Sequence, residues 1–596
     1  MNPDKEPAME VPLQPWLAHY PEGMPAQIDP DSCGSVKELL RQAFTRFAER
    51  PAYTSLGHTM NWREMDLASR DLAAALQHVL GLRRGERLAV MMPNLLQHPV
   101  CTFAALRAGL VVVNVNPLYT ARELAHQLLD SGAAAIVVLE HHAHVLEQAM
   151  LENPTLKLEV VVTSTGDLLP TVRELVTNLV VRHVRHQVPA WRLPGAQPFK
   201  ELLEQGSHHL LDDLPLKGSD TAFLQYTGGT TGVAKGAVLT HRNIVANMLQ
   251  LAAWIARDLR DGEELALMPL PLYHAYALTC HLVFTRIGAH MLLVANPRDP
   301  DELVGTMRRH AVSVMIGVNS LYRSLLDTPG FDAVDLHHLK VCAAGGMAVQ
   351  RVVAQRWKAR AGVPLVEGYG LTEASPVVSS NRLDIVDWTG SVGYPLPSTE
   401  VCVLDDAGRP LAAGAIGEIA VRGPQVMQGY WRRPAETQQA FAPGGWLRTG
   451  DVGFLDPEGA LHVTDRKKDM IIVSGFKVYP NEVEDVVAMH PGVAEVAAIG
   501  VPDPSAGEVV KLVVLRRDSA LTAEQLTEHC RKYLTGYKLP RRIEFRGEPL
   551  PKSPIGKVLR RELREASLPP EKPRPREGGG GHEGAAAEPA EAGGGS

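Results

Sequence analysis

The sequence predicts an α/β protein: a large N-terminal domain of several subdomains, with mixed β-sheets flanked by helices, followed by a small α+β C-terminal domain. Through the middle of the 596-residue chain, short apolar runs alternate with helical patterns, which is typical of sheets covered by helices. A second, shorter alternation begins near Asp465. A chain of this length also exceeds what one hydrophobic core usually supports, so we expect at least two domains.

The domain boundaries follow changes in pattern and composition. We expect the large domain to cover residues 1–464 and the small, mobile domain residues 465–567. After Pro569 the chain consists mainly of Pro, Glu, Gly and Ala and ends in Gly-Gly-Gly-Ser. Because such a composition cannot bury a core, residues 568–596 are expected to form a disordered tail.

In the large domain, the pattern predicts strands on both sides of a glycine-rich loop. These strands cover residues 222–225 and 236–239, and Thr240 is expected to cap a following helix. Further strands are expected at 312–316, 341–344 and 363–367, with an amphipathic helix over 347–361.

In the small domain, Asn481 is expected to cap a short helix. The pattern then predicts strands at 493–499 and 509–515, a helix at 521–533 that ends before Lys538-Leu539-Pro540, and a closing segment at 558–566.

Composition excludes several classes of protein. The formal charge of −7 argues against a general nucleic-acid-binding protein. The six cysteines are scattered without a Cys-x-x-Cys pair, which favours a reducing compartment and no structural zinc. The N-terminus is polar and proline-rich, so neither a signal peptide nor a transmembrane span is expected there.

The loop from Tyr226 to Gly236 carries the clearest chemistry. It reads Tyr-Thr-Gly-Gly-Thr-Thr-Gly-Val-Ala-Lys-Gly. Glycines let backbone N–H groups converge on phosphate oxygens, hydroxyls can orient a metal ion, and the lysine adds a positive charge. A Walker A motif needs Gly before its lysine and Ser or Thr after it, whereas Ala234 and Gly236 flank Lys235. A P-loop NTPase is therefore disfavoured; the structural alternative is a Gly/Thr-rich surface hairpin.

Several other unusual segments come after the loop in order. They are Met268 to His274, Ala343 to Met347, Glu367 to Glu373, Gly423 to Trp431, Trp446 to Asp451, Asp465 to Asp469, Ser474 to Glu484 and Pro551 to Val558.

This ordered series resembles the adenylate-forming (AMP-binding) superfamily and is closest to bacterial long-chain fatty acyl-CoA synthetases. The resemblance spans about Trp62 to Arg564. It implies the adenylate-forming fold and an ATP-dependent, AMP-forming acid–thiol ligase. A fatty acid carboxylate would attack the α-phosphate of ATP to give acyl-AMP and pyrophosphate, and the thiol of CoA would then displace AMP.

The resemblance also implies roles for individual residues that bind ATP and Mg²⁺. Thr227 and Glu373 would contact Mg²⁺, Thr372 the α-phosphate, and Tyr369 would stack on adenine. Asp451 and Arg466 would hold the ribose. The remaining nucleotide-binding residues implied are Gly228, Gly229, Thr230, Thr231, Gly232, Lys235, Gly345, Gly346, Glu367 and Gly368.

Lys557 is the implied adenylation lysine, which would stabilise charge between the attacking carboxylate and the α-phosphate. Lys468 would be the interdomain hinge. After adenylation, Lys557 would leave the site, and Ser474, Gly475, Phe476 and Lys477 would arrive to line a CoA channel. His274 would be a gate near the carboxylate. The implied catalytic residues are thus Lys557, His274, Thr372 and Glu373.

Each of these residues has a structural alternative when taken alone. Glu373 could be an acid at a helix N-terminus, Asp451 a turn residue, and His274 a structural histidine. Arg466 and Lys557 could be solvated surface charges, and the segment from Asp465 to Asp469 a plain charged linker.

The residues directly after His274 narrow the choice of acid substrate. Amino-acid-activating relatives place an aspartate there, but residues 275–280 contain no carboxylate. Because an unpaired buried ammonium would be costly, amino acids are not expected. Apolar and small residues indicate a tunnel for an alkyl chain, with Gly317 and Val318 as candidate lining, or else a plain core helix. Medium-chain acids remain an alternative to long-chain acids.

Two rival functions remain. One is a fatty acyl-AMP ligase with a carrier-protein acceptor, and the other is a non-catalytic lipid-binding relative. Expected partners are fatty acid, ATP and CoA, without nucleic acid. A homodimer and peripheral contact with the inner face of the membrane are further expectations for a cytoplasmic protein without a hydrophobic anchor.

Overall fold

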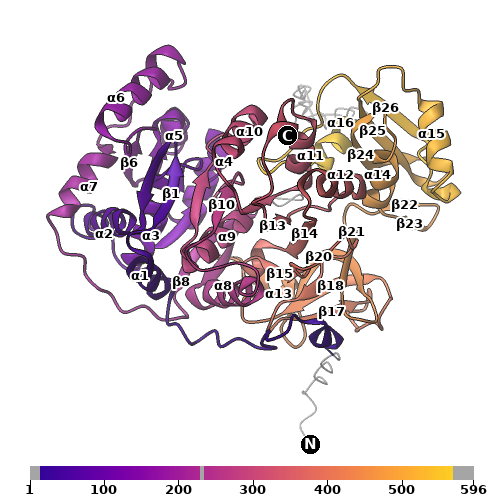
Figure 1. Ribbon diagram of the computed structural model, residues 1–596, viewed down its shortest axis with the longest axis horizontal. Coiled ribbons are helices and arrows are strands. Elements are labelled where there is room, and N and C mark those ends of the chain that lie inside the picture. The colour runs from indigo at the N-terminus through magenta and orange to yellow at the C-terminus, as the bar shows by residue number, and fades with distance from the viewer. Residues whose placement is uncertain (1–13, 228–233, 568–596) are drawn as a thin grey trace, which may run out of the picture.

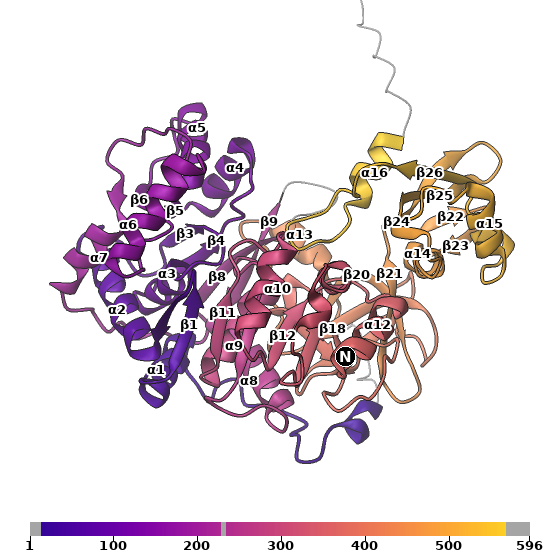
Figure 2. The same cartoon turned by 45° about the horizontal axis from the view of Figure 1, so that its top comes forward.

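The computed structural model describes residues 14–227 and 234–567. The predicted loop residues Gly228, Gly229, Thr230, Thr231 and Gly232 and the predicted tail 568–596 lie outside these ranges. Within the described residues, the strands form four sheets, and helices flank the two largest (Figures 1 and 2). The predicted fold class, mixed sheets flanked by helices with a smaller C-terminal unit, is confirmed.

The first sheet has the strand order β7-β6-β5-β3-β4-β8-β9 and is parallel except for the β8–β9 hairpin. Its central strands are runs of β-branched and other apolar residues that are buried on both faces, as parallel sheets require. The strands are β3 (Arg87–Met91), β4 (Val111–Asn114), β5 (Ala135–Leu139), β6 (Glu159–Thr163), β7 (Gln197–Pro198), β8 (Thr221–Thr227) and β9 (Lys235–Thr240).

The described helices of the N-terminal part of the chain lie around this sheet, apart from η1, which packs against residues 394–395. They are η1 (Pro15–His19), α1 (Val36–Phe47), α2 (Trp62–His78), α3 (Gln97–Arg107), α4 (Ala121–Ser131), η2 (Glu140–His142), α5 (Ala143–Glu152), α6 (Thr171–Leu179), the π-helical turn η3 (Val180–Val184) and α7 (Phe199–Ser207).

The second sheet has the strand order β16-β15-β14-β13-β12-β10-β11-β1-β2. Strands β14, β13, β12, β10, β11 and β1 are parallel, so the carboxyl ends of neighbouring strands meet at one edge. The strands are β1 (Pro51–Ser55), β2 (His58–Asn61), β10 (Leu265–Met268), β11 (His290–Leu293), β12 (Val314–Gly317), β13 (Val341–Ala344), β14 (Leu365–Gly370), β15 (Val377–Ser380) and β16 (Tyr394–Pro395).

The helices associated with the second sheet include α8 and α9, which cross the centre of the molecule (Figure 1). Thr240 caps α8 as predicted, and it forms a capping box with Asn243. The helices are α8 (His241–Ile255), α9 (Ala275–Arg286), α10 (Pro300–Arg309), α11 (Asn319–Asp327), η4 (Phe331–Ala333), α12 (Arg351–Ala361) and η5 (Thr372–Ala374).

A third sheet, antiparallel, comes next in the chain. It consists of β17 (Glu400–Leu404), β18 (Gly417–Arg422), β19 (Phe441–Ala442), β20 (Trp446–Leu455) and β21 (Leu461–Arg466), with α13 (Pro434–Ala440) beside it. Strand β21 pairs with β20, and in this pairing Arg466 lies opposite Asp451.

The C-terminal unit has its own sheet and its own hydrophobic core. It lies at one end of the molecule, and the α5–α7 region lies at the other (Figure 1). Its elements are β22 (Ile471–Val473), β23 (Phe476–Val478), α14 (Pro480–Ala488), β24 (Val493–Asp503), β25 (Gly507–Arg516), α15 (Ala523–Arg531), η6 (Gly536–Lys538), β26 (Arg542–Arg546) and α16 (Arg560–Ser567).

Two local predictions need correction. The helix expected from residue 347 begins at Arg351, because a glycine-containing turn precedes it and Gln350 is the N-cap. Asn481 does not cap α14: Tyr479 is the N-cap and Pro480 occupies the first turn, where its fixed φ is favourable. The Asn481 side chain instead donates to the carbonyl oxygen of Thr464 (3.0 Å) and accepts from Arg560 (2.5 Å).

All six cysteines are free thiols. Among the described helices, none combines the length and apolar composition that crossing a bilayer would require.

Candidate active site

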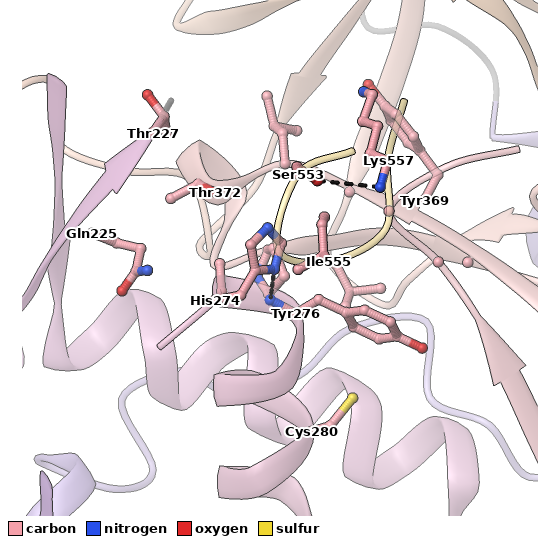
Figure 3. A pocket seen from close by; sticks show the side chains of 18 of the residues that line it. Gln225, Thr227, His274, Tyr276, Cys280, Tyr369, Thr372, Ser553, Ile555 and Lys557 are labelled. Atoms are coloured by element: carbon pink, nitrogen blue, oxygen red, sulfur yellow. Dashed lines mark hydrogen bonds between the residues drawn. The ribbon is translucent and has the colours of Figure 1, made fainter. Parts of the chain in front are cut away.

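One cavity of about 1130 Å³ lies between the large unit and the C-terminal unit. Its floor is the edge where strands β12, β13 and β14 end, which is where parallel sheets usually bind ligands. The C-terminal unit closes one side with residues 552–555 and 557–561, and Thr227 and Lys235 stand on another side. Figure 3 shows Lys557, Thr372, Tyr369 and His274 around this space.

A tight turn of the C-terminal unit carries Lys557 into the cavity. The backbone N–H of Ser553 donates to the carbonyl oxygen of Lys557 (2.7 Å), and the N–H of Lys557 donates to Ser553 Oγ (3.2 Å). Gly556 has a φ of +85°, and a Cβ there would lie 2.3 Å from Ser320 Oγ of the large unit. A glycine at this position therefore allows the turn to approach α11 closely.

The electrostatics around Lys557 suit an anionic ligand. Burial, followed by repulsion from Arg466, lowers the pKa of the Lys557 ammonium to about 8. The group is thus largely protonated at neutral pH while buried in a site that supplies too little negative charge to offset its burial.

His274 is the N-cap of α9, and its Nδ1 accepts a hydrogen bond from the backbone N–H of Tyr276 (3.3 Å). Burial, followed by repulsion from Lys557, lowers the pKa of the ring to about 4. The ring is therefore neutral at pH 7 and carries its proton on Nε2. A neutral imidazole beside a lysine can donate to a carboxylate oxygen.

The wall formed by β14, β20 and β21 holds Tyr369, Asp451 and Arg466 together. The Tyr369 hydroxyl donates to Asp451 Oδ2 (2.7 Å), and Arg466 Nε lies 3.1 Å from Asp451 Oδ1. Tyr369 and Arg466 line the cavity, whereas Asp451 is buried behind them and does not. Both carboxylate oxygens of Asp451 are thus occupied in this structure.

Gly345 and Gly346, just after β13, line the same part of the cavity. A Cβ on Gly345 would lie 3.3 Å from the Tyr276 ring and 3.5 Å from the carbonyl oxygen of Gly368, and Gly346 has a φ of +76°. Because neither position has a side chain, the backbone itself forms this part of the cavity wall.

The phosphate side of the cavity gathers Thr227, Lys235, Thr372 and Glu373. Glu373 Oε1 accepts a hydrogen bond from the Tyr430 hydroxyl (2.7 Å), and Lys235 Nζ lies 5.3 Å from the centre of the Tyr430 ring. Tyr430 therefore positions both groups, a role that was not predicted although Gly423 to Trp431 was recognised as unusual. The carboxylate of Glu373 and the hydroxyl of Thr227 are oxygen donors of the kind that Mg²⁺ prefers.

Glu367 was predicted to bind the nucleotide, but its side chain does not line the cavity. Val366, Gly368 and Tyr369 of the same strand line the cavity, whereas Glu367 is buried away from it. Glu367 Oε1 instead accepts from the backbone N–H of Val349 (3.2 Å), and burial raises the pKa of its carboxyl to about 8.

The predicted CoA-channel residues lie outside the cavity in this structure. Ser474, Gly475, Phe476 and Lys477 are all exposed, and the Phe476 ring stacks on Tyr537 with centroids 4.8 Å apart. Lys468, the predicted hinge, does line the cavity, and burial lowers the pKa of its ammonium.

Beyond His274 the cavity continues as an apolar branch. Helix α9 contributes Tyr276, Cys280, Val283 and Phe284, which share one helical face, and Figure 3 shows Cys280 one turn deeper than Tyr276. The opposite walls come from α8 and from strand residues, namely Leu251, Trp254, Ile255, Val314, Ile316, Val341 and Ala343.

The apolar tunnel expected from residues 275–280 is therefore present, but two candidates for its lining were wrong. Gly317 and Val318 do not line it, because Gly317 is packed against the Tyr322 ring, 2.8 Å from where a Cβ would be. The contribution of α8 was not predicted from the sequence.

Comparisons with known proteins agree with this geometry. The sequence profile described as "AMP-binding enzyme" matches residues 40–431, and the one described as "AMP-binding enzyme C-terminal domain" matches residues 482–557. A long-chain-fatty-acid–CoA ligase of Salmonella typhimurium is 50% identical over 551 residues, which cover 92% of this chain and 98% of that protein. The enzyme of the same name from Bacillus subtilis is 37% identical over 559 residues, or 93% and 98% of the two chains.

Solved structures have a similar fold. An anthranilate CoA ligase in complex with anthranoyl-AMP superposes with a TM-score of 0.80 at 25% identity, covering 90% of this chain and 99% of that one. A fatty acyl CoA synthetase of Mycobacterium tuberculosis gives a TM-score of 0.63 at 28% identity, covering 89% and 98%.

A cavity at the carboxyl ends of β12, β13 and β14, with Thr227 and Lys235 on one side and a second lysine supplied by the C-terminal unit, agrees with these relatives in defining an adenylate-forming enzyme. The chain belongs to the AMP-binding enzyme family.

Proposed function

We propose that this protein is a long-chain fatty acid–CoA ligase, which converts a fatty acid, ATP and CoA into acyl-CoA, AMP and pyrophosphate through an acyl-adenylate. The observation that carries the proposal is the continuity of one cavity, which joins a polar end around Lys557 to an apolar branch along α9. Relatives that are 50% identical over 92% of this chain are named long-chain-fatty-acid–CoA ligases.

In the first half-reaction the carboxylate of the fatty acid, an anion, must approach the negatively charged triphosphate of ATP. Two unit charges about 4 Å apart repel by about 4 kcal/mol at an effective dielectric constant of 20. Lys557 would sit between the carboxylate and the α-phosphate, with Thr372 donating to the phosphate and the Nε2–H of His274 donating to the carboxylate. These groups stabilise charge and do not abstract a proton, since a fatty acid is already ionised at neutral pH.

The remaining nucleotide contacts depend on the walls of the cavity. Adenine would lie against Tyr369, with Gly345 and Gly346 on its other side. Arg466 would lie beside the ribose, with Asp451 directly behind it. Glu373 and Thr227 would hold a Mg²⁺ ion. When bound, such an ion neutralises phosphate charge and orients the triphosphate.

The second half-reaction would require a rearrangement of the C-terminal unit. The large-unit sheet ends at Arg466 and the first strand of the C-terminal unit begins at Ile471, so the boundary expected at residue 465 would fall at the end of β21, just before the connection that contains Lys468. Rotation there would withdraw Lys557 and bring residues 474–477 to the cavity as the CoA channel. The expected homodimer is part of this proposal and is tested by light scattering in solution.

The test is release of AMP and pyrophosphate from ATP with Mg²⁺, across saturated acids of increasing chain length, each with and without CoA. CoA-dependent turnover that peaks at long chains is expected. Acid-dependent pyrophosphate release without any effect of CoA would instead indicate an acyl-AMP ligase with another acceptor. No turnover with any acid would contradict the proposal and favour a non-catalytic lipid-binding relative.

A further inference from the structure

Helix α6 and the turn η3 that continues it, together residues 171–184, present an apolar surface to solvent. No residue of α6 is buried. Val172 is 77% exposed, Leu175 66%, Val176 57% and Leu179 58%. These four residues are spaced i, i+3, i+4 and i+7, so they form one continuous stripe on the helix.

The opposite, polar side of α6 is the one that contacts the protein. Glu174 forms a salt bridge with Lys200 of α7 (2.7 Å), and Asn178 Oδ1 accepts from the backbone N–H of Gly166 (2.9 Å). Arg173 donates to the carbonyl oxygen of Gly57. An amphipathic helix on a globular protein normally turns its apolar face to the core, and α6 does the reverse.

The π-helical turn η3 extends the stripe. A π-turn has about one residue more per turn than an α-helix, so Val184, five residues after Leu179, comes next on the outward side. Val184 is 65% exposed. Val181 is buried and Arg182 pairs with Glu140 (2.7 Å), so the inner side of the turn remains attached to the protein.

The charge around the stripe is positive. Residues 171–192 contain four arginines, Arg173, Arg182, Arg185 and Arg192, two histidines and a single acidic residue, Glu174. Glu174 pairs with Lys200 and Arg182 pairs with Glu140, so the net positive charge comes from the other three arginines. Within the described part of the chain, no carboxylate lies within salt-bridge distance of Arg173, Arg185 or Arg192. The helix stands at the outer edge of the molecule, at the end away from the C-terminal unit (Figures 1 and 2).

We propose that the α6–η3 helix docks this protein on the surface of an anionic lipid bilayer, with the valine and leucine stripe in the interface and the arginines at the headgroups. A helix of this kind lies in the plane of the interface, and a convex apolar stripe fits a fluid surface. A second copy of the chain is a poorer occupant, because a two-fold contact would bring the two arginine clusters together. The docking would hold the enzyme where fatty acids partition, but it does not depend on the catalytic proposal.

The test is co-sedimentation of the full chain with vesicles of phosphatidylcholine and phosphatidylglycerol, compared with phosphatidylcholine alone. The full chain is expected to bind the mixed vesicles more tightly. Replacing Leu175→Asp and Leu179→Asp together should lower the partition coefficient by about a hundredfold, roughly tenfold for each leucine removed from the interface. Arg185→Gln with Arg192→Gln should remove most of the preference for phosphatidylglycerol and leave binding to phosphatidylcholine unchanged.

The matched control is Leu210→Asp with Val386→Asp, which adds the same charge at two apolar positions outside α6 and η3. Leu210 is 89% exposed and Val386 is 75% exposed. It should bind as the unaltered chain does. All variants lie outside the active site, so pyrophosphate release without vesicles reports whether they fold. Equal binding by the stripe variant and the unaltered chain, or no binding by the unaltered chain, would overturn the proposal. So would a lower solution mass of the stripe variant, which would indicate that the stripe joins two copies of the chain.

Discussion

At the scale of single residues, Lys557 is a buried cation that the protein does not fully pair. Burying an ammonium without a partner is costly, and burial here lowers its pKa to about 8. Neighbouring Arg466 adds repulsion where a structural lysine would have a carboxylate partner. The cost is offset when the negative charges of the substrates enter the cavity.

Replacing Lys557→Ala should slow acyl-AMP formation by about a thousandfold, because the developing charge loses its buried counter-charge. Thioester formation from supplied acyl-AMP should be nearly unchanged. Separate assays of the two half-reactions measure this, with Lys532→Ala, an exposed lysine of the same unit, as the control. Equal loss in both half-reactions would contradict a specific role of Lys557 in acyl-AMP formation.

The lowered pKa of Lys557 also predicts a pH dependence. The ammonium is protonated below about pH 8 and loses its proton as the pH rises through that value. Since kcat/KM reports the free enzyme, kcat/KM for ATP in acyl-AMP formation should fall as the pH rises above about 8. A Lys557→Arg variant stays charged over this range, and its profile should lack the fall even if its activity is lower. The same fall in this variant would mean that another group titrates.

At the scale of elements, α9 separates two environments. Its N-cap His274 lies at the polar end of the cavity, one face lines the apolar branch, and the rest of the helix is packed in the main hydrophobic core. The distance along this face from His274 therefore sets how many methylene groups of a bound acid the branch accepts. Burial of each one contributes about 0.8 kcal/mol.

Cys280 lies one turn below Tyr276 on this face, so Cys280→Phe should shorten the branch. Long-chain acids should lose about a hundredfold in kcat/KM, while short acids that end above residue 280 should react as before. A series of saturated acids measured with the variant tests this, and the short acids are the internal control for folding. An unchanged chain-length profile would mean that the alkyl chain does not run along α9.

At the scale of the whole molecule, the arrangement seen here is the one that brings Lys557 to the cavity. The turn at Gly556 contacts Ser320, and Arg517 of the C-terminal unit pairs with Asp327 of α11 (3.1 Å). Residues 474–477 meanwhile remain exposed. If one cavity serves both half-reactions, these contacts must break and others must form.

A substitution in the exposed loop should separate the half-reactions. Gly475→Leu should leave acyl-AMP formation largely intact and lower thioester formation at least about a hundredfold, because a side chain there would occupy the path of CoA. Gly475 has a φ of +85°, so a matched control is Gly195→Leu, at φ +81° in a distant turn with equal space around it. Loss of acyl-AMP formation in a folded Gly475→Leu protein would contradict the two-state interpretation.

The sequence also anticipated much of the structure, and its failures have a common cause. Strands around the phosphate loop, the Thr240 cap and the strand 341–344 were predicted because local pattern and capping chemistry decide them. Asn481 was misassigned because a good capping residue comes after a proline that fits the first turn better. Glu367 was predicted to bind the nucleotide from its motif, but the motif does not fix the contacts of each side chain, and here Glu367 accepts from the backbone of Val349.

The sequence by itself determined a phosphate-binding loop, since glycines, hydroxyls and a lysine suit a triphosphate, and the resemblance of its ordered motifs to the adenylate-forming superfamily implied the class of chemistry. Only the tertiary structure decided where the apolar branch lies, because it is built from α8, α9 and strand residues that are far apart in the chain. It alone also decided that α6 turns its apolar stripe outward. An amphipathic pattern predicts that a helix has a polar and an apolar face, but contacts with distant segments determine which face is exposed to solvent.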